Sequence, residues 1–170
     1  MDKQILFREL QKQNQKWIWF LLIILGATIL FGSIQQIIFN RPFGTHPVPD
    51  WGFIPLFGLL VLFYYLLFGS RLYTEISADR ILYQYKPFHR KAKVIKWDQV
   101  SECYIRLYSP VKEFGGWGIR RAIKGKKGKA FNVSGKVGIQ LELKDGRKIL
   151  IGTNKGKEAE VALKSLQKTN

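Results

Sequence analysis

The sequence predicts a membrane-spanning α-hairpin followed by a small antiparallel β-sandwich or barrel, which a C-terminal helix closes. Three observations support this fold class. Two uncharged apolar runs of eighteen residues lie within the first seventy residues. The remaining hundred residues change to short alternating runs separated by turn residues, and they end in one amphipathic segment. The net charge is also concentrated in the second part of the chain, because +14 of the formal net charge of +16 falls after Ser70.

Each apolar run is long enough to cross a bilayer. The runs cover residues 17–34 and 51–68, and eighteen helical residues extend about 27 Å, close to the hydrocarbon thickness of a membrane. Tryptophan residues stand at the ends of the runs, where indole rings favour the headgroup level. We therefore expect transmembrane helices over residues 17–39 and 51–70, joined by an extracytoplasmic link over residues 40–50.

The basic residues beside the two runs predict the orientation of the hairpin. Residues 1–16 hold four basic side chains and Arg71 follows the second run, whereas the link carries one arginine and one aspartate. Basic residues mark the cytoplasmic side, so both termini are expected in the cytoplasm, with a cytoplasmic N-terminal segment over residues 1–16 and a cytoplasmic domain over residues 71–170. Neither run carries an ionisable side chain, which favours an anchor over a transport pathway.

Alternating runs after Ser70 predict about seven short antiparallel strands. The strongest local signal is the hairpin formed by residues 137–143 and 147–151 around Asp145-Gly146. Residues 157–168 predict the closing helix, because their apolar side chains recur on one helical face. That face consists of Ala159, Ala162, Leu163 and Leu166.

A family resemblance rests on several short segments of the second part of the chain. They are FGGWGIR at 114–120, NVSG at 132–135, GIQLELKD at 138–145, ILIGT at 149–153 and KWD at 96–98. In these segments and in its order of strands and closing helix, the chain resembles a pleckstrin-homology-like (PH-like) domain. With the two spans included, it is similar to uncharacterised bacterial two-pass membrane proteins that carry such a domain. The resemblance implies a fold and a location in the bacterial inner membrane, but no activity and no site residue.

Basic side chains gather in two segments of the predicted domain. An anion-binding or lipid-facing surface is one interpretation, since each basic residue near an anionic leaflet contributes about 1 kcal/mol. The other interpretation is that these residues serve topology and solubility alone. The candidates are Arg90, Lys91, Lys93, Arg120, Arg121, Lys124, Lys126, Lys127 and Lys129.

Residue types that carry catalysis or bind metals are sparse. The two histidines lie far apart, in the link and in a strand turn, so neither a catalytic triad nor a structural zinc site is expected. Cys103 has no partner for a disulfide and falls inside an alternating strand, which predicts a buried, inert thiol. The glycines around Trp117 lack the spacing of a phosphate-binding loop and predict a bend in the sheet. Trp117 itself is either an exposed partner-docking residue or a core aromatic.

These features together predict a non-enzymatic, membrane-anchored PH-like interaction module that needs no cofactor. It is expected to bind a membrane protein, a second copy of itself, anionic headgroups, or a combination of these. An alternative is a ligand-gated membrane effector whose basic domain senses a nucleotide-like anion. Nucleic-acid binding is the weakest interpretation, because charge alone attracts nucleic acid without specificity.

Overall fold

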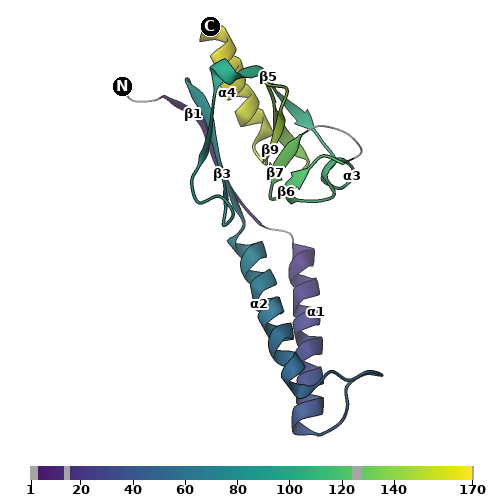
Figure 1. Ribbon diagram of the computed structural model, residues 1–170. Helices are drawn as coiled ribbons and strands as arrows, with labels where there is room; N and C mark the ends of the chain where they lie inside the picture. Colours follow the sequence, from purple (N-terminus) through teal and green to yellow (C-terminus); the bar gives the residue numbers. More distant parts are fainter. Residues whose placement is uncertain (1–3, 14–15, 124–127, 170) are drawn as a thin grey trace. The chain divides into compact units, whose positions relative to one another are not determined.

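The computed structural model describes residues 4–13, 16–123 and 128–169, and the chain divides into two compact units (Figure 1). Residues 14–69 form the first unit, which we call the helix pair. Residues 1–13 and 70–170 form the second, which we call the sheet unit. The first thirteen residues therefore belong with the C-terminal part of the chain, an arrangement that the sequence analysis did not anticipate.

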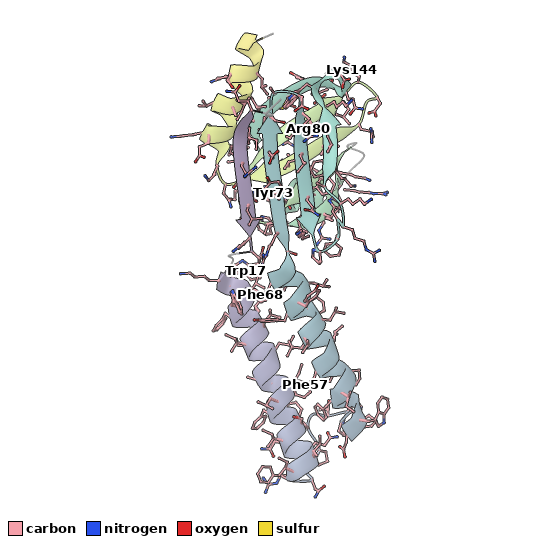
Figure 2. The ribbon with its side chains drawn as sticks, turned by 90° about the vertical axis from the view of Figure 1, so that its left-hand side faces the viewer. Trp17, Phe57, Phe68, Tyr73, Arg80 and Lys144 are labelled. Carbon is pink, nitrogen blue, oxygen red and sulfur yellow. The ribbon has the colours of Figure 1, made fainter. Side chains whose placement is uncertain are left out.

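The helix pair contains α1 (Lys16–Ser33), which continues as the π-helical turn η1 (Ile34–Ile38), and α2 (Phe53–Gly69), which follows the 3-10 turn η2 (Asp50–Gly52). The helices pack through aromatic rings, with the Trp19 ring centroid 3.6 Å from that of Phe68. Gly26 of α1 faces Leu60 of α2, where a Cβ atom would lie 3.4 Å from the Leu60 Cδ2 atom, an ordinary packing distance. Most apolar side chains of both helices point outward (Figure 2), and both helices are long and apolar enough to cross a membrane.

The first sheet of the sheet unit is an antiparallel meander of four strands. Its order is β1 (Ile5–Lys12), β2 (Arg71–Ser77), β3 (Arg80–Lys86) and β4 (Lys93–Lys96). Strand β1 was not expected, and it pairs with β2 from Ile5 opposite Ser77 to Lys12 opposite Arg71. The helix pair is thus inserted in the chain between the first two strands of one sheet.

The second sheet has five strands in the order β5-β8-β9-β7-β6. These are β5 (Val100–Leu107), β6 (Gly118–Arg121), β7 (Lys129–Asn132), β8 (Val137–Leu143) and β9 (Lys148–Thr153). The expectation of antiparallel strands alone is wrong here, because β7 and β9 are parallel. Strand β8 runs opposite to β7, and the β8–β9 hairpin reverses the chain again. Strand β9 lies between the two, so it runs in the same direction as β7.

One hydrophobic core joins the two sheets and the C-terminal helix α4 (Gly156–Thr169). Leu72, Ile76 and Ile81 enter it from the first sheet, and Ile139 and Ile151 enter it from the second. The predicted helix face is confirmed, since α4 buries Ala159, Ala162 and Leu163 in this core and leaves Leu166 partly buried. Helix α4 contacts β1 and β5, which are edge strands of the two sheets, and it therefore covers one open side between them.

A second small cluster lies on the outer face of the five-stranded sheet. Between β5 and β6 the chain forms a short helix, α3 (Pro110–Phe114), which packs Phe114 against Tyr108, Ala130 and Leu150. The helix begins at Ser109, whose hydroxyl oxygen accepts a hydrogen bond from the Lys112 amide, and Pro110 occupies its first turn. It ends at Gly115, which has a left-handed backbone with φ of 72°.

Candidate functional site

Two long stretches of the sheet unit contain basic residues and no carboxylate. Residues 80–97, which form β3 and β4, hold six basic side chains, and residues 114–141, which include β6 and β7, hold seven. Every aspartate and glutamate of the sheet unit therefore lies outside these two stretches. Such segregation produces a local positive potential even where the individual side chains are far from one another.

The structure brings these two stretches together, although they belong to different sheets. The ring of Phe131 on β7 lies 4.9 Å from the Tyr83 ring and 5.3 Å from the His89 ring. The Lys93 Nζ atom lies 5.8 Å from the centroid of the same Phe131 ring. The β3–β4 connection and β7 are therefore neighbours across the space between the sheets.

Strand β6 reaches the same neighbourhood through Arg120. Burial raises the pKa of the Tyr85 hydroxyl, while a hydrogen bond with Ser70 and the positive charge of Arg120 act in the opposite direction. The Arg120 Nε atom donates to the Trp117 carbonyl oxygen at 3.0 Å, which fixes part of the side chain beside the start of β6. The two predicted groups of basic residues thus form one basic surface, which we define by its described members. These are Arg90, Lys91, Lys93, Arg120, Arg121 and Lys129.

All six of these side chains of the basic surface are exposed. Within the part of the chain that the structure describes, none of the six has a carboxylate partner within 4 Å. The remaining candidates, Lys124, Lys126 and Lys127, lie outside the described residues. A surface with so many exposed and unpaired cations is suited to an anionic ligand or an anionic membrane.

The turn after β3 is a tightly bonded part of this surface. The Tyr85 amide donates to His89 Nδ1 at 3.2 Å, and the His89 amide donates to the Tyr85 carbonyl at 2.7 Å. The side-chain Nε2 atom of Gln84 donates to the backbone carbonyls of His89 and Arg90 at 3.0 and 3.2 Å. Burial and the charge of Lys93 lower the pKa of His89, which favours the neutral ring that accepts the Tyr85 hydrogen bond. Phe88 stands at the tip of this turn with 58% of its surface exposed.

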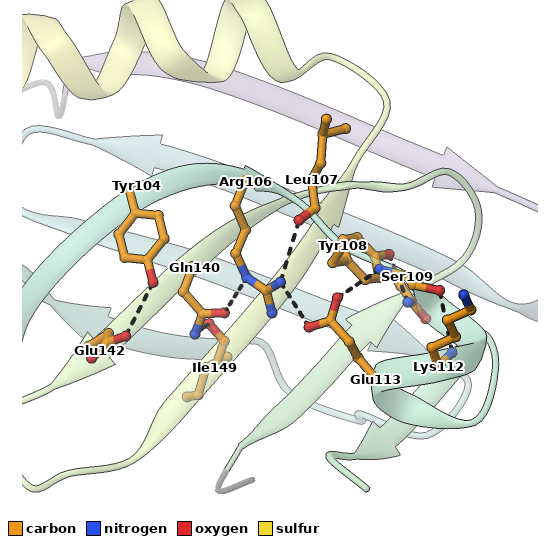
Figure 3. A network of polar contacts seen from close by, with 11 residues as sticks. Tyr104, Arg106, Leu107, Tyr108, Ser109, Lys112, Glu113, Gln140, Glu142 and Ile149 are labelled. Carbon is orange, nitrogen blue, oxygen red and sulfur yellow. Dashed lines mark hydrogen bonds and ion pairs between the residues drawn. The ribbon is translucent and has the colours of Figure 1, made fainter.

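A pocket of about 500 Å³ lies on the outer face of the five-stranded sheet, beside α3. The Arg106 guanidinium at its centre donates to Gln140 Oε1 at 3.0 Å and to Glu113 Oε2 at 2.9 Å (Figure 3). The other Glu113 oxygen accepts the Ser109 amide at 2.7 Å. Glu113 therefore both caps α3 and neutralises Arg106.

A second ion pair occupies the other side of the same pocket. Lys148 Nζ lies 2.7 Å from Glu142 Oε1, and the Tyr104 hydroxyl donates to the same oxygen at 3.2 Å. The hydrogen bond from Lys148 lowers the pKa of Glu142, so this carboxylate stays ionised at neutral pH. Among the described residues that line the pocket, Arg106 and Lys148 are thus matched by carboxylates, whereas Lys129, which also belongs to the basic surface, has no such partner.

The structure places the remaining candidates of the sequence analysis within the sheet unit. The indole Nε1 of Trp117 donates to the Gly135 carbonyl at 3.2 Å, and its half-buried ring belongs to neither described core cluster. Cys103 is partly buried against the main core, and this burial raises the pKa of its thiol to about 12, which disfavours the reactive thiolate. Gly116 and Gly118 have φ values of 126° and 112°, so the glycines around Trp117 bend the chain as expected.

Comparison with known families assigns the whole chain. Residues 1–168 match a family of unknown function, DUF6141. The chain belongs to the DUF6141 family. This match includes the helix pair and the sheet unit together, so both are parts of one DUF6141 sequence rather than separate modules. Comparison of the DUF6141 chain with curated proteins and with solved structures found no match.

Sequence reasoning missed two sets of polar residues in this DUF6141 chain. The first is on β1, where Glu9 accepts hydrogen bonds from the Thr153 hydroxyl at 2.6 Å and from the Asn154 amide at 2.9 Å. No local sequence pattern predicts a contact between two residues, such as Glu9 and Thr153, that are 144 positions apart. The second is the pocket around Arg106, which lies beside α3. This helix could have been predicted, because Ser109-Pro110 is a helix start signal and Gly115-Gly116 is a helix stop signal.

Proposed function

We propose that the DUF6141 chain is a non-enzymatic, membrane-anchored PH-like module whose basic surface binds anionic lipid headgroups at the cytoplasmic face of a bacterial inner membrane. One observation carries this proposal. Two acid-free basic stretches from different sheets come together, and the described members of the basic surface that they form have no carboxylate partner within 4 Å. Topology alone requires basic residues only near the ends of membrane spans, whereas β6 and β7 lie about fifty residues beyond the second apolar helix.

The helix pair supplies the anchor in this proposal. Its two helices have the length and apolar composition of membrane spans. The charged residues in α1, η1, η2 and α2 are Lys16, at the start of α1, and Asp50 in the η2 turn. A domain tethered in this way is held at a high effective concentration near the headgroups. Individually weak contacts of about 1 kcal/mol per basic residue are then sufficient for stable engagement.

Two features of the sheet unit support its PH-like character. The first four strands form an antiparallel meander, and a single helix follows the last strand and packs across sheet edges. The parallel pair β7–β9 is a departure from a simple antiparallel order. The proposal therefore takes from the PH-like resemblance the general layout of two sheets and a closing helix, and no ligand.

An aromatic residue at the edge of the basic surface also favours a lipid partner. Phe88 projects from a turn whose neighbours include Lys86, Arg90 and Lys91, all exposed. Aromatic side chains beside cations are common at membrane interfaces, where the ring enters the headgroup region and the cations meet phosphates. The alternative function, sensing of a nucleotide-like anion, finds less support, because both Arg106 and Lys148 in the pocket are already paired with carboxylates.

The test uses the full chain, since a fragment that starts at Arg71 would lose β1 and its contacts with β2 and β9. The chain is reconstituted in nanodiscs of phosphatidylcholine, with or without phosphatidylglycerol, and amide hydrogen exchange is measured over residues 86–93 and 118–123. We expect slower exchange in both segments in anionic nanodiscs, and we expect the difference to vanish as salt is raised.

A charge-matched pair of variants makes this test specific. The substitutions Arg90→Gln, Lys91→Gln and Lys93→Gln together should abolish the protection by anionic lipid. The control carries Lys112→Gln, Lys144→Gln and Lys157→Gln, which remove the same charge from exposed positions outside the basic surface and should preserve the protection. Equal exchange in neutral and anionic nanodiscs at low salt would overturn headgroup binding and direct the search to a protein partner.

A further inference from the structure

Three cations stand directly opposite one another at one end of the four-stranded sheet. The strand register pairs Lys12 of β1 with Arg71 of β2, and Arg71 in turn with Lys86 of β3. All three are exposed on the outer face of the sheet, because the residues beside them, Gln11, Leu72 and Tyr85, point into the core side. Neighbouring strands are about 4.8 Å apart, so the three positions fall within about 10 Å. We call this set the cationic row.

Such a row costs stability unless something neutralises it, because like charges directly opposite one another on a sheet repel. Among the residues that the structure describes, no member of the row has a carboxylate within 4 Å. The acidic residue on the same face is Glu75, four residues along β2 from Arg71, and it is already engaged by Arg8 at 3.1 Å and by the Tyr73 hydroxyl. Three adjacent cations thus have no counterion among the residues that the structure describes.

A hollow of about 300 Å³ adjoins the row on this face. Arg71 and Lys86 line it together with Leu10, Tyr73 and Gln84. Tyr73 is among the residues marked in Figure 2, which views this face of the sheet. Burial and the neighbouring Glu75 raise the pKa of Tyr73, so its ring is uncharged at neutral pH. The hollow thus offers cations on one side and an apolar and amide surface on the other.

The position of the row in the chain specifies which anion it meets. Lys12 precedes α1 by three residues, and Ser70 alone separates Arg71 from α2. The row therefore marks the end of the sheet through which the chain continues into both apolar helices. If those helices span a bilayer, a fully extended linker of three residues keeps Lys12 within about 14 Å of the start of α1.

We propose that the cationic row and its hollow form a site for the phosphate of an anionic phospholipid headgroup. This inference rests on the proposed function, since the lipid source of the phosphate requires that the helix pair be in the membrane. The phosphate replaces the missing counterion between Lys12, Arg71 and Lys86, and the adjoining hollow takes the polar remainder of the headgroup. The row adds a defined site to the diffuse attraction of the basic surface.

Thermal unfolding of the full chain in neutral detergent micelles tests the site. Phosphatidylglycerol, phosphatidylcholine or inorganic phosphate is added, and the unfolding midpoint is compared between wild type and Lys86→Gln. Phosphatidylglycerol should raise the wild-type midpoint by about 4 °C or more at saturation, and phosphatidylcholine should not. A similar rise with inorganic phosphate alone would support the phosphate site and identify free phosphate as sufficient.

The Lys86→Gln variant has a signature that a merely structural lysine would not produce. Without lipid it should unfold at or above the wild-type midpoint, because the repulsion within the row is relieved. The rise with phosphatidylglycerol should nevertheless fall to less than half of the wild-type value. Lys12→Gln should behave in the same way, whereas Lys144→Gln, an equal charge change in the β8–β9 turn, should match wild type.

The outcomes separate this inference from the proposed function. A Lys86→Gln protein that is less stable than wild type without lipid, and that keeps the full response to phosphatidylglycerol, would overturn the site. If the exchange protection at Arg90, Lys91 and Lys93 persisted in that case, the basic surface would stand without the row. Loss of that protection together with a response that still depends on Lys86 would leave the row as the lipid site and remove the basic surface.

Discussion

The outer faces of the two sheets use charge in opposite ways. On the five-stranded sheet, Glu142 stands directly opposite Lys148, and Arg106 is held between Gln140 and Glu113. On the four-stranded sheet, the register places Lys12, Arg71 and Lys86 side by side with no carboxylate among them. The first face pairs Arg106 and Lys148 with carboxylates, while on the second face these three cations have no such partner among the described residues. A structural charge and a binding charge are thus distinguished by their partners rather than by their residue type.

The largest effect is expected where a polar side chain is both buried and hydrogen-bonded. Glu9→Ala removes the acceptor for the Thr153 hydroxyl and the Asn154 amide and should lower the free energy of unfolding by about 3 kcal/mol. Denaturant unfolding of the full chain in micelles, followed by far-ultraviolet circular dichroism, measures this loss. Glu102→Ala, which removes an exposed carboxylate from β5, is the control and should change stability little. Equal effects of the two substitutions would mean that β1 is not held by its buried glutamate.

The pocket on the second sheet should show an intermediate effect. Arg106→Met leaves Glu113 without its guanidinium partner and should cost about 1–2 kcal/mol, because both side chains are half-buried. Double-mutant cycles with Glu113→Gln measure the coupling between the two residues. A coupling energy near zero would show that the ion pair between Arg106 and Glu113 does not stabilise the fold. In that respect the outer face of the five-stranded sheet would not differ from that of the four-stranded sheet.

Reversing one charge of the cationic row should give a smaller effect of opposite sign. Lys86→Glu converts a repulsive neighbour of Arg71 into an attractive one and should raise the free energy of unfolding by about 0.5–1 kcal/mol. The same denaturant experiment without lipid measures the gain. Lys144→Glu is the control for a general reduction of net charge. A gain of the same size in both variants would attribute the effect to net charge and not to the row.

The smallest effect is expected from the pH dependence of the paired face. The hydrogen bond from Lys148 lowers the pKa of Glu142 in the folded chain. A lowered folded pKa contributes stability above the unfolded pKa of about 4.3, and this contribution is lost as the pH falls through the folded value. The unfolding midpoint of wild type should therefore drop more steeply below about pH 4.3 than that of Glu142→Gln. If the unfolding midpoints of the two proteins fell equally steeply at acid pH, the Glu142–Lys148 pair would contribute nothing to the acid sensitivity.

The sequence predicted those elements whose apolar residues alternate or repeat in the expected period. Both apolar helices, most strands and the buried face of α4 follow from such patterns. Strand β1 was missed because its inward positions include Glu9 and Gln11, while Leu10 points outward and is about half exposed. A strand that buries polar side chains has the opposite pattern to the one that sequence reasoning seeks, and its polar partners on β9 are distant in the chain.

The candidate sites show the same limit. Arg90, Lys91 and Lys93 were predicted as one group and Arg120, Arg121 and Lys129 as another, but only the packing around Phe131 shows that they share a surface. The cationic row was invisible for a similar reason, since its three members come from strands separated by the helix pair and by a hairpin. Composition identifies the charge of a segment, and strand register decides which charges become neighbours.

The insertion of the helix pair between β1 and β2 has a consequence for biogenesis. Two strands can pair only in the same compartment, so the segment between them must cross a membrane an even number of times, whether zero or two. A chain that inserted only one of the two apolar helices would leave β1 and β2 on opposite sides of the bilayer and could not complete the first sheet. Completion of the first sheet therefore requires that both apolar helices insert or that neither does.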